Sequence, residues 1–418
     1  MSEWKETRLK SLLSSPLTYG LNVSAEDDRE DWPRYIRITD FDDYNNLKED
    51  TFKSLPLSVA EAALLEEGDL LLARSGATAG KTFLYSKLPY GACYAGYLIR
   101  ARFNKNIALP KFISYFTKGS LYTNWKERYC IQTTIQNISA ERYNQLPIII
   151  PSVKEQQRIV DYLDKKLATI DHRVELLEKE KDAYVRLKKS VINQAVTRGL
   201  NPNVPLKDSG IDWIGMIPEH WEIKRIKELC TFVSRGATPD YVDDSNFKVM
   251  NQAVFSSGKL NHEIVKYSSI MKSDSQIRKG DLLIASTGGG VLGKLYYFDD
   301  IDQNFYADSH VTIVRNDKGS FNVKLLYYLL SINFDMINAC MAKGSTNQTE
   351  LQREKLLAYE ISIPPLSEQQ AIADYLDEKC AKIDAAIENI SKQIDASKRL
   401  KKAVINEAIS GKINFEDN

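Results

Sequence analysis

The chain repeats itself at domain scale, and this repeat restricts its fold more than any other feature. The segment EQQRIVDYLD at 155–164 returns as EQQAIADYLD at 368–377, and KKSVINQA at 188–195 returns as KKAVINEA at 401–408. Both pairs are 213 residues apart (368 minus 155, and 401 minus 188), about half of the 418-residue chain. Solenoid units have only about 20 to 50 residues. We therefore expect two domain-sized copies of one fold.

The match is looser upstream of these segments. Trp4 and Arg8 recur as Trp221 and Arg225, and 68–73 recurs as 280–285. Each copy thus has a divergent N-terminal part, which we call its front, and a closely repeated C-terminal part, which we call its back.

Composition is ordinary for a globular protein, with 43% hydrophobic residues. No apolar run could span a bilayer and no signal peptide is visible, so the expected compartment is the cytoplasm. Lys plus Arg equals Asp plus Glu, 56 each, so any contact with nucleic acid must use local patches. Five dispersed cysteines without a Cys-x-x-Cys and four histidines indicate neither a disulfide framework nor a metal cluster.

The repeated backs predict two long helices, because apolar residues recur at alternating spacings of three and four. Polar Lys188 and Lys401 occupy equivalent positions in this seam. A capping box is expected at Ser152 with Glu155 and another at Ser367 with Gln370, and Gly199 and Gly411 follow the helix ends. The main seam positions are Leu163, Leu167, Ile170, Val174 and Leu177 in the first helix, and Leu376, Ile383, Ile387, Ile390 and Ile394 in the second.

Helices of roughly 45 residues, at about 1.5 Å per residue, are too long to pack on one such domain. Two matching seams in one chain predict an intramolecular antiparallel coiled coil related by a pseudo-twofold axis. Dimerisation between chains is the alternative.

The fronts read as mixed α and β, so the fold class is α+β with two globular domains separated by the helix pair. Expected strands cover 70–73, 82–85, 97–103 and 146–150 in the first front, and 282–285, 295–298 and 311–314 in the second. Amphipathic helices are expected at 110–117 and 323–333. The predicted boundaries are 1–151 for the first domain, 152–198 for its helix, 199–216 for a linker, 217–364 for the second domain, 365–411 for its helix and 412–418 for a tail.

Two glycine-rich loops approach the pattern of a phosphate-binding loop. Gly76 to Gly80 has too few intervening residues, and Gly288 to Lys294 has the right spacing but ends in Leu295 where a hydroxyl is needed. Strands are expected after both loops, whereas a phosphate site needs a helix N-terminus. A hairpin loop that approaches a nucleic-acid backbone is the favoured interpretation.

No catalytic constellation is recognisable. The string Asn201-Pro202-Asn203-Val204 lacks the second proline and the aromatic residue of an amino-methyltransferase motif. Glu222-Ile223-Lys224 resembles part of a nuclease motif but lacks the preceding Pro-Asp. We therefore predict a chain without chemistry of its own.

The segment from Ser209 to Glu222, SGIDWIGMIPEHWE, resembles the start of a target-recognition domain in specificity subunits of type I restriction-modification systems. The proline-rich turn into Glu-Gln-Gln and Asp-Tyr-Leu-Asp, present twice, is similar to the same family. The resemblance covers the whole chain, although the first copy keeps only Trp4, Arg8 and Leu9 of this start.

This resemblance implies a DNA-reading scaffold in which each front domain recognises half of a bipartite target and the helices set the gap. It also implies double-stranded DNA, two modification subunits and two restriction (motor-nuclease) subunits as partners, and no membrane. S-adenosylmethionine, ATP and Mg would bind those subunits, and no cofactor or metal would bind this chain.

Polar residues in and near the glycine-rich loops are the candidate DNA contacts, because amides pair with adenine edges and lysines with phosphate or guanine. In the first domain they are Arg74, Ser75, Thr78, Lys81, Thr82, Thr133, Thr134, Gln136 and Asn137. In the second they are Ser286, Thr287, Lys294, Ser345, Thr346, Asn347 and Gln348. For each of them a loop-capping or solvated role is at least as common.

Two other groups have an open interpretation. Tyr94, Tyr97, Tyr143 and Tyr306 are expected in the core rather than stacked on bases. The cluster at 398–402, KRLKK, could contact phosphate or simply be a solvated helix end. A nucleotide-binding enzyme and a coiled-coil assembly scaffold without DNA specificity are the alternatives to the DNA-specificity scaffold.

Overall fold

The computed structural model describes residues 4–25, 27–42, 45–76, 78–130, 137–212, 214–288, 290–300, 302, 304–333, 341–344 and 349–413. Its contacts divide the chain into two compact units. Unit 1 combines Met1–Glu178 with Lys392–Asn418, and unit 2 is Lys179–Ser391. Both division points lie inside long helices.

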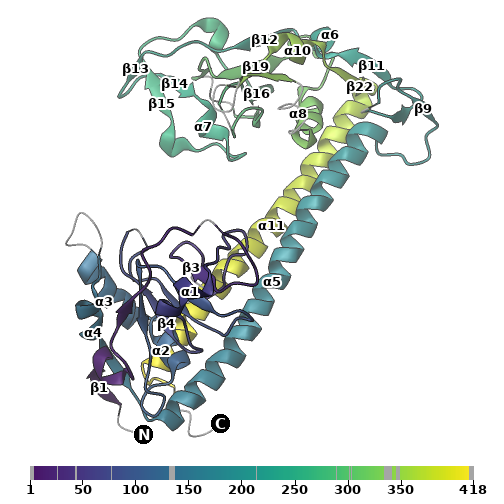
Figure 1. The fold of residues 1–418 in the computed structure, drawn as a ribbon. Coiled ribbons are helices and arrows are strands. Elements are labelled where there is room, and N and C mark those ends of the chain that lie inside the picture. Colours follow the sequence, from purple (N-terminus) through teal and green to yellow (C-terminus); the bar gives the residue numbers. More distant parts are fainter. Residues whose placement is uncertain are drawn as a thin grey trace. The chain divides into compact units, whose positions relative to one another are not determined.

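Unit 1 is built on a four-stranded antiparallel sheet (Figure 1). Its strand order is β2 (Thr18–Tyr19), β7 (Leu98–Ala101), β4 (Leu70–Ala73) and β5 (Thr82–Leu84). A parallel pair, β3 (Arg34–Ile36) with β6 (Ala92–Tyr94), and an antiparallel pair, β1 (Lys5–Arg8) with β8 (Pro147–Ile150), complete the strands. Its short helices are α1 (Leu57–Ala60), α2 (Pro110–Phe116), α3 (Ser120–Cys130) and α4 (Ala140–Asn144).

Unit 2 repeats this topology. Its main sheet has the order β12 (Phe232–Arg235), β19 (Val311–Arg315), β16 (Asp281–Ala285) and β17 (Leu295–Phe298). The parallel pair is β14 (Phe247–Met250) with β18 (Phe305–Ala307), extended by β15 (Lys266–Ser268) and β13 (Tyr241–Val242), and β11 (Glu222–Arg225) pairs with β22 (Glu360–Ile363).

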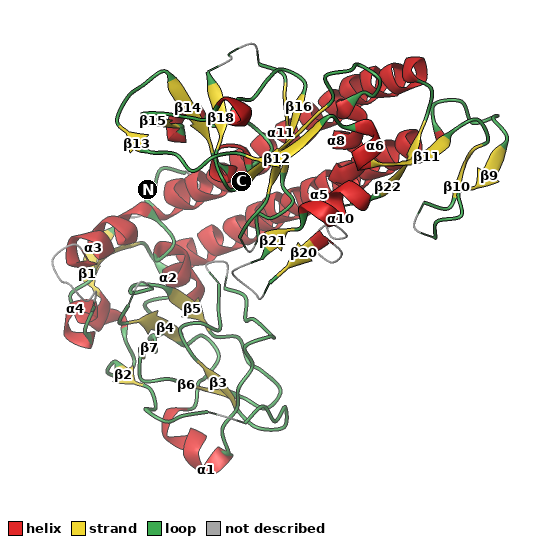
Figure 2. Cartoon of the chain, turned by 90° about the horizontal axis from the view of Figure 1, so that it is seen from above, coloured by secondary structure: helices red, strands yellow, loops and turns green. Residues whose placement is uncertain are grey.

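Further elements of unit 2 surround these strands (Figure 2). They are α6 (Ile226–Leu229), α7 (Gln252–Phe255), α8 (Val323–Ile332), α10 (Arg353–Ala358), and the strand pairs β9 (Leu206–Asp208) with β10 (Met216–Pro218) and β20 (Ala342–Lys343) with β21 (Glu350–Leu351).

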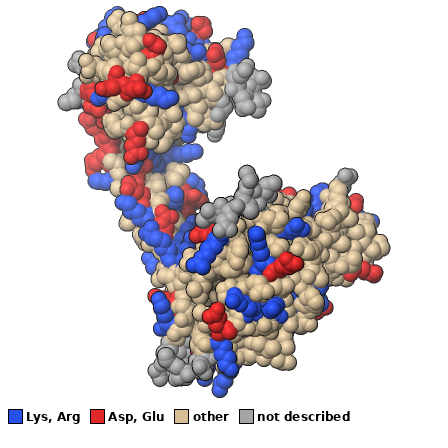
Figure 3. Space-filling view, turned by 90° about the vertical axis from the view of Figure 1, so that its left-hand side faces the viewer, with Lys and Arg blue, Asp and Glu red and all other residues tan. Residues whose placement is uncertain are grey.

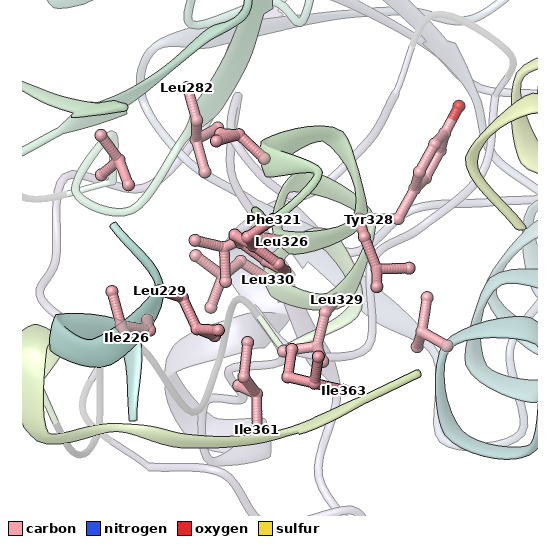
Figure 4. Close-up of a cluster of buried hydrophobic side chains, with 14 of the residues drawn as sticks. Ile226, Leu229, Leu282, Phe321, Leu326, Tyr328, Leu329, Leu330, Ile361 and Ile363 are labelled. Atoms are coloured by element: carbon pink, nitrogen blue, oxygen red, sulfur yellow. The ribbon is translucent and has the colours of Figure 1, made fainter. Parts of the chain in front are cut away.

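The strands and helices expected from the sequence are confirmed, with ends that shift by a few residues. β4 is buried at every position, as expected for a central strand with an apolar run. The core of unit 2 gathers around the apolar helix α8, where Leu326 and Leu330 are fully buried. Side chains from β16, α6 and β22 converge on that helix (Figure 4).

Two helices are much longer than the rest. α5 covers Val153–Arg198 and α11 covers Leu366–Ile409. In unit 1 the start of α5 and the end of α11 share a core, which includes Leu163 and Ile405. In unit 2 the end of α5 and the start of α11 do so, with Ile192 and Leu376. The helices are therefore antiparallel partners within one chain, and they lie side by side in both views (Figures 1 and 2).

Most of the predicted seam positions are buried. Of its ten main positions only Val174 and Ile387, which are equivalent at the 213-residue offset, are half-buried rather than buried. The same spacing of three and four residues continues to Val191 and Val404, and there the prediction is wrong: both are only half-buried, whereas the neighbouring Ile192 and Ile405 are each 4% exposed. There each helix packs on a domain core, which buries a broader face than a coiled-coil stripe.

The two seam lysines make equivalent ion pairs. Lys401 Nζ lies 2.6 Å from Asp171 Oδ1 in unit 1, and Lys188 Nζ lies 2.6 Å from Asp384 Oδ2 in unit 2. Adding 213 to Lys188 and Asp171 gives Lys401 and Asp384. Each ion pair thus joins a lysine of one copy to an aspartate of the other, and the two pairs are related by exchanging the copies. Such reciprocal contacts are the pattern of a twofold interface.

The helix ends follow the sequence signals only in part. Ser152 Oγ accepts a hydrogen bond from the backbone N–H of Glu155, and Gly199 and Gly411 adopt φ values of 74° and 71° after the helices. The capping boxes themselves are wrong. The Glu155 carboxylate accepts from Trp4 Nε1, and α11 begins at Leu366, so Ser367 already lies inside its first turn.

The repeated polar motif attaches each front domain to its helix. Gln156 Oε1 accepts from the backbone N–H of Leu109 at 2.8 Å, and Gln369 Oε1 accepts from that of Asn322 at 2.8 Å. Asn322 lies 213 residues after Leu109. The sequence EQQ therefore recurs because it makes the same docking contact twice.

The aspartate that ends each Asp-Tyr-Leu-Asp segment makes a second docking contact. Asp164 accepts from Lys111 Nζ at 2.6 Å and from the Tyr115 hydroxyl at 2.5 Å. Burial raises the pKa of Tyr115, and its bond to the carboxylate raises it further. In unit 2 Asp377 binds Lys324 and Tyr328 in the same way.

None of the helices within the described ranges combines the length and the apolarity that a bilayer crossing requires.

Candidate nucleic-acid interface

The first glycine-rich loop connects two antiparallel strands. β4 and β5 pair in register from Leu70 with Leu84 to Leu72 with Thr82, and the backbones of Ala73 and Lys81 continue the ladder at 2.8 Å. Gly76 and Gly80 have φ values of 77° and 81°, which glycine adopts without strain. Since a strand follows the loop, it lacks the helix N-terminus of a phosphate-binding loop.

Three segments distant in sequence meet at this loop. The Arg74 backbone N–H donates to Tyr97 O at 2.9 Å, and the Ile138 N–H donates to Arg74 O at 2.7 Å. Ser75 and Asn137 form an isolated β-bridge. We call residues 74–76, 78–81, Tyr97 and 137–139 rim 1.

Unit 2 builds the same arrangement with different side chains. The Ser286 backbone N–H donates to His310 O at 2.8 Å, and the Leu351 N–H donates to Ser286 O at 2.9 Å. Thr287 and Glu350 form the equivalent bridge. We call residues 286–288, 290–294, His310 and 349–351 rim 2. His310 and Leu351 lie 213 residues after Tyr97 and Ile138, which confirms the equivalence.

Two backbone segments approach each other closely in each unit, at Gly20 in unit 1 and at Gly236 in unit 2. A Cβ placed on Gly20 would lie 2.2 Å from the carbonyl oxygen of Tyr94, and one on Gly236 would lie 1.9 Å from that of Ala307. Only glycine fits at these two equivalent positions.

Rim 1 presents an aromatic, an amide and a cation. The Tyr97 side chain is 65% exposed, and Thr78 and Asn137 are exposed as well. The Arg74 guanidinium carbon lies 4.9 Å from the centre of the Tyr19 ring. Such groups can hydrogen-bond to base edges, stack and neutralise phosphate.

Rim 2 presents different chemistry on the same backbone. Thr287 Oγ1 lies 2.8 Å from His310 Nδ1, and His310 and Glu350 are exposed. Arg235 Nη2 donates to Leu351 O at 3.3 Å and lies 3.5 Å from the Glu350 carboxylate. Arg74, Ser75, Tyr97 and Asn137 of rim 1 are thus replaced by Ser286, Thr287, His310 and Glu350.

The structure brings only part of the predicted DNA contacts to the rims. Six of them, besides Lys81 and Ser286, lie in the rims. Thr78 and Asn137 are exposed, and the half-buried ones are Arg74, Ser75, Thr287 and Lys294. The predicted residues Thr133, Thr134, Gln136, Ser345, Thr346, Asn347 and Gln348 lie outside the described residues.

Three candidates point into the protein and are corrected. Lys81 Nζ donates to Phe41 O at 2.5 Å, Thr82 is 8% exposed with its hydroxyl 2.8 Å from that of Thr117, and Ser286 is fully buried against Thr312. Each of these groups satisfies a polar contact inside its unit, which removes it from base or phosphate contact.

The aromatic residues also divide. Tyr94 and Tyr143 are core residues, as predicted, and the Tyr143 hydroxyl donates to Ala73 O at 2.8 Å. The prediction is wrong for Tyr97. The equivalent residue in the second copy is His310. A polar histidine at the equivalent position indicates an exposed site, and the 213-residue offset would have revealed this from the sequence.

One buried carboxyl lies beside rim 2. Asp308 is 3% exposed, and burial raises its pKa above the ordinary value of 3.8 despite a hydrogen bond from the His310 backbone N–H at 2.9 Å. Across the described part of the chain, no group of three or more His, Cys, Asp or Glu side chains could hold a metal ion.

Comparison with known proteins decides the family. The model of the type I restriction modification DNA specificity domain matches residues 1–181 and again 218–396. The chain belongs to this family of DNA specificity domains. Sequence-specific DNA recognition is therefore its function, and the nucleotide-binding and pure assembly alternatives are not favoured.

Relatives of this specificity family cover most of the chain. The type I restriction enzyme MjaVIII specificity subunit of Methanocaldococcus jannaschii is 24% identical over 85% of this chain and 81% of its own. The EcoKI specificity subunit of Escherichia coli is 21% identical over 89% of this chain and 82% of its own.

Solved structures share the fold. A chain from a study of complex assembly and conformational transition of the type I R-M system has a TM-score of 0.75 at 18% identity and covers 98% of both chains. The HsdS subunit from Thermoanaerobacter tengcongensis has a TM-score of 0.52 at 18% identity, over 98% of this chain and 97% of its own. Two front domains with paired long helices are therefore the fold of the family.

Proposed function

We propose that rim 1 and rim 2 each read one half of a bipartite DNA target. The observation that supports this most strongly is that two rims with the same backbone contacts carry different side chains. A repeated backbone positions its side chains alike on DNA, whereas different side chains select different bases. The target is accordingly asymmetric, with two short blocks of different sequence.

The side chains proposed to contact DNA are those that the rims hold near solvent. They are Arg74, Ser75, Thr78, Tyr97 and Asn137 for one block, and Thr287, Lys294, His310 and Glu350 for the other. Tyr97 supplies a face for stacking, and Glu350 can accept from a cytosine amino group.

The long helices are proposed to set the unread gap between the blocks. α5 contains 46 residues and α11 contains 44. At about 1.5 Å per residue each is a rod of roughly 65 to 70 Å. A stiff pair of this kind fixes the number of base pairs between two readers.

Specificity subunits of this family are generally non-catalytic and assemble with modification and restriction subunits. We infer two copies of each here, with S-adenosylmethionine, ATP and Mg bound by those subunits.

Methylome sequencing tests this function. Cells would express the chain with its cognate modification subunit and with no other modification system. The expected result is one modified motif with two unequal blocks separated by a fixed gap. A contiguous motif, or no motif from an assembled complex, would show that the two rims do not act as separate readers.

A further inference from the structure

Unit 1 contains an open groove of about 1050 Å³ beside rim 1. Thr78 and Gly80 of the rim line it, and so do Lys398, Lys401 and Lys402 of α11. The groove therefore borders both a loop proposed to contact DNA and the basic cluster near the end of the helix.

The groove is strongly basic in a chain of zero net charge. Seven lysines and two aspartates line it, an excess of five positive charges, although Lys81 donates to Phe41 O and Lys398 Nζ lies 3.9 Å from Glu178 Oε1. The two aspartates, Asp164 and Asp171, are occupied by Lys111 and Lys401. Several Lys and Arg side chains also lie on the visible face of unit 1, whereas basic and acidic side chains alternate along the helix pair (Figure 3). This clustering suits a polyanion and not a single small anion.

Packing connects the groove to the rim. A Cβ on Gly80 would lie 2.2 Å from Cδ of Lys126, so the aliphatic stem of Lys126 lies directly on the rim backbone. The Tyr122 hydroxyl donates to Gly80 O at 2.8 Å and holds the loop against α3. A strand of DNA that contacts the exposed side of rim 1 is thus brought to the mouth of the groove.

The second copy lacks part of this charge. At the 213-residue offset, Lys118 corresponds to Ser331 and Lys398 corresponds to Val185. The ion-paired seam lysine, by contrast, is present in both copies. Lys118 and Lys398 are therefore not needed for the scaffold itself, since the other copy folds without them.

We propose that this groove binds the phosphate backbone of DNA beside the block read by rim 1, so that the two halves of the target are held unequally. The proposal rests on the proposed function, because it takes rim 1 to be a DNA reader. Lys118, Lys126, Lys398 and Lys402 supply sequence-independent affinity on that side, and rim 2 depends more on its base contacts.

The test compares two double variants in the complex with modification subunits. K118S/K398V introduces the residues of the second copy, and K105S/K154S removes two exposed lysines of unit 1 that do not line the groove. Equilibrium binding to cognate and to unrelated duplex DNA is measured over a range of salt concentrations. Thermal unfolding verifies that both variants are folded.

For K118S/K398V the slope of log K against log salt is expected to fall by about 2, since each phosphate contact contributes about 0.9. Affinity near 0.1 M salt is expected to fall by roughly one to two orders of magnitude, equally for cognate and unrelated DNA. Phosphate-ethylation interference should be lost beside one block only. The control double variant should keep the wild-type slope.

Several results would overturn the proposal. They are an unchanged slope for K118S/K398V, an equal change for the control, or ethylation effects beside both blocks. Weaker assembly with the modification subunits at an unchanged slope would assign the groove to an acidic protein segment instead. Failure of the proposed function itself has a different signature, because the wild-type complex would then show no preference for any DNA sequence.

Discussion

At the residue scale, Gln156 and Gln369 show how one side chain attaches a divergent domain to a repeated helix. Each accepts a backbone hydrogen bond from its own front domain, and Gln156 also donates to Ile107 O and Pro151 O at 2.9 Å. Gln156 is fully buried, so water cannot replace these bonds.

Gln156→Ala should therefore destabilise unit 1 by about 1–3 kcal/mol, because it leaves the Leu109 N–H without this acceptor and the buried Pro151 carbonyl without this donor. The neighbouring Gln157 is exposed and donates to exposed Asp161, and Gln157→Ala should cost less than about 0.5 kcal/mol. Urea unfolding of both variants checks the difference, and equal costs would contradict the docking role.

Asp308 gives a pH-dependent prediction. Burial raises the pKa of Asp308 in the folded state above 3.8. The contribution of this residue to the free energy of unfolding is therefore complete below that pH, and it is lost as the pH rises through the pKa of the folded state. At neutral pH this residue therefore contributes less to stability than at low pH, because a charge at this buried position is disfavoured. Asp308→Asn keeps an oxygen acceptor for the His310 N–H and removes that charge.

The thermal midpoint of Asp308→Asn should therefore exceed that of the wild type at pH 7, and the difference should shrink toward about pH 4. A midpoint below the wild type at pH 7 would show that the ionised carboxylate stabilises this loop.

At the element scale, the periodicity of apolar residues predicted the individual helices and strands, whereas the surroundings of the loop residues depend on tertiary packing. The seam from Leu163 to Leu177 and the strand 70–73 were readable because their burial follows a regular pattern. The rims were not, since Arg74, Tyr97 and Ile138 meet only after folding. Residue type alone also misplaced Lys81 and Thr82, whose polar atoms find partners inside unit 1.

The helix pair yields a prediction of its own. Four residues inserted after Glu178 in α5 and after Ser391 in α11, which are equivalent positions 213 apart, would lengthen both rods by about 6 Å. Base pairs rise about 3.4 Å each, so the unread gap should grow by one or two base pairs. Both blocks should stay the same. The modified motif of the variant complex checks this, and an unaltered gap would exclude the helices as the spacer.

At the scale of the whole molecule, duplication accounts for both the sameness and the difference of the two halves. The docking contacts and the ion pairs of Lys188 and Lys401 recur at one offset, whereas the rim side chains and the groove lysines Lys118 and Lys398 do not. A single scaffold used twice can thus read two unrelated sequences. The repeat was visible in the sequence, but the segments that meet at each rim became apparent only in the fold.

The central claim, that the two units read DNA independently, is tested most directly by exchanging one of them. Residues 1–151 would be replaced by the corresponding front of another family member, with residues 152–418 unchanged. The modified motif of the resulting complex would then be sequenced. The account predicts one altered block, with the other block and the gap unchanged. A change in both blocks, or in neither, would contradict it.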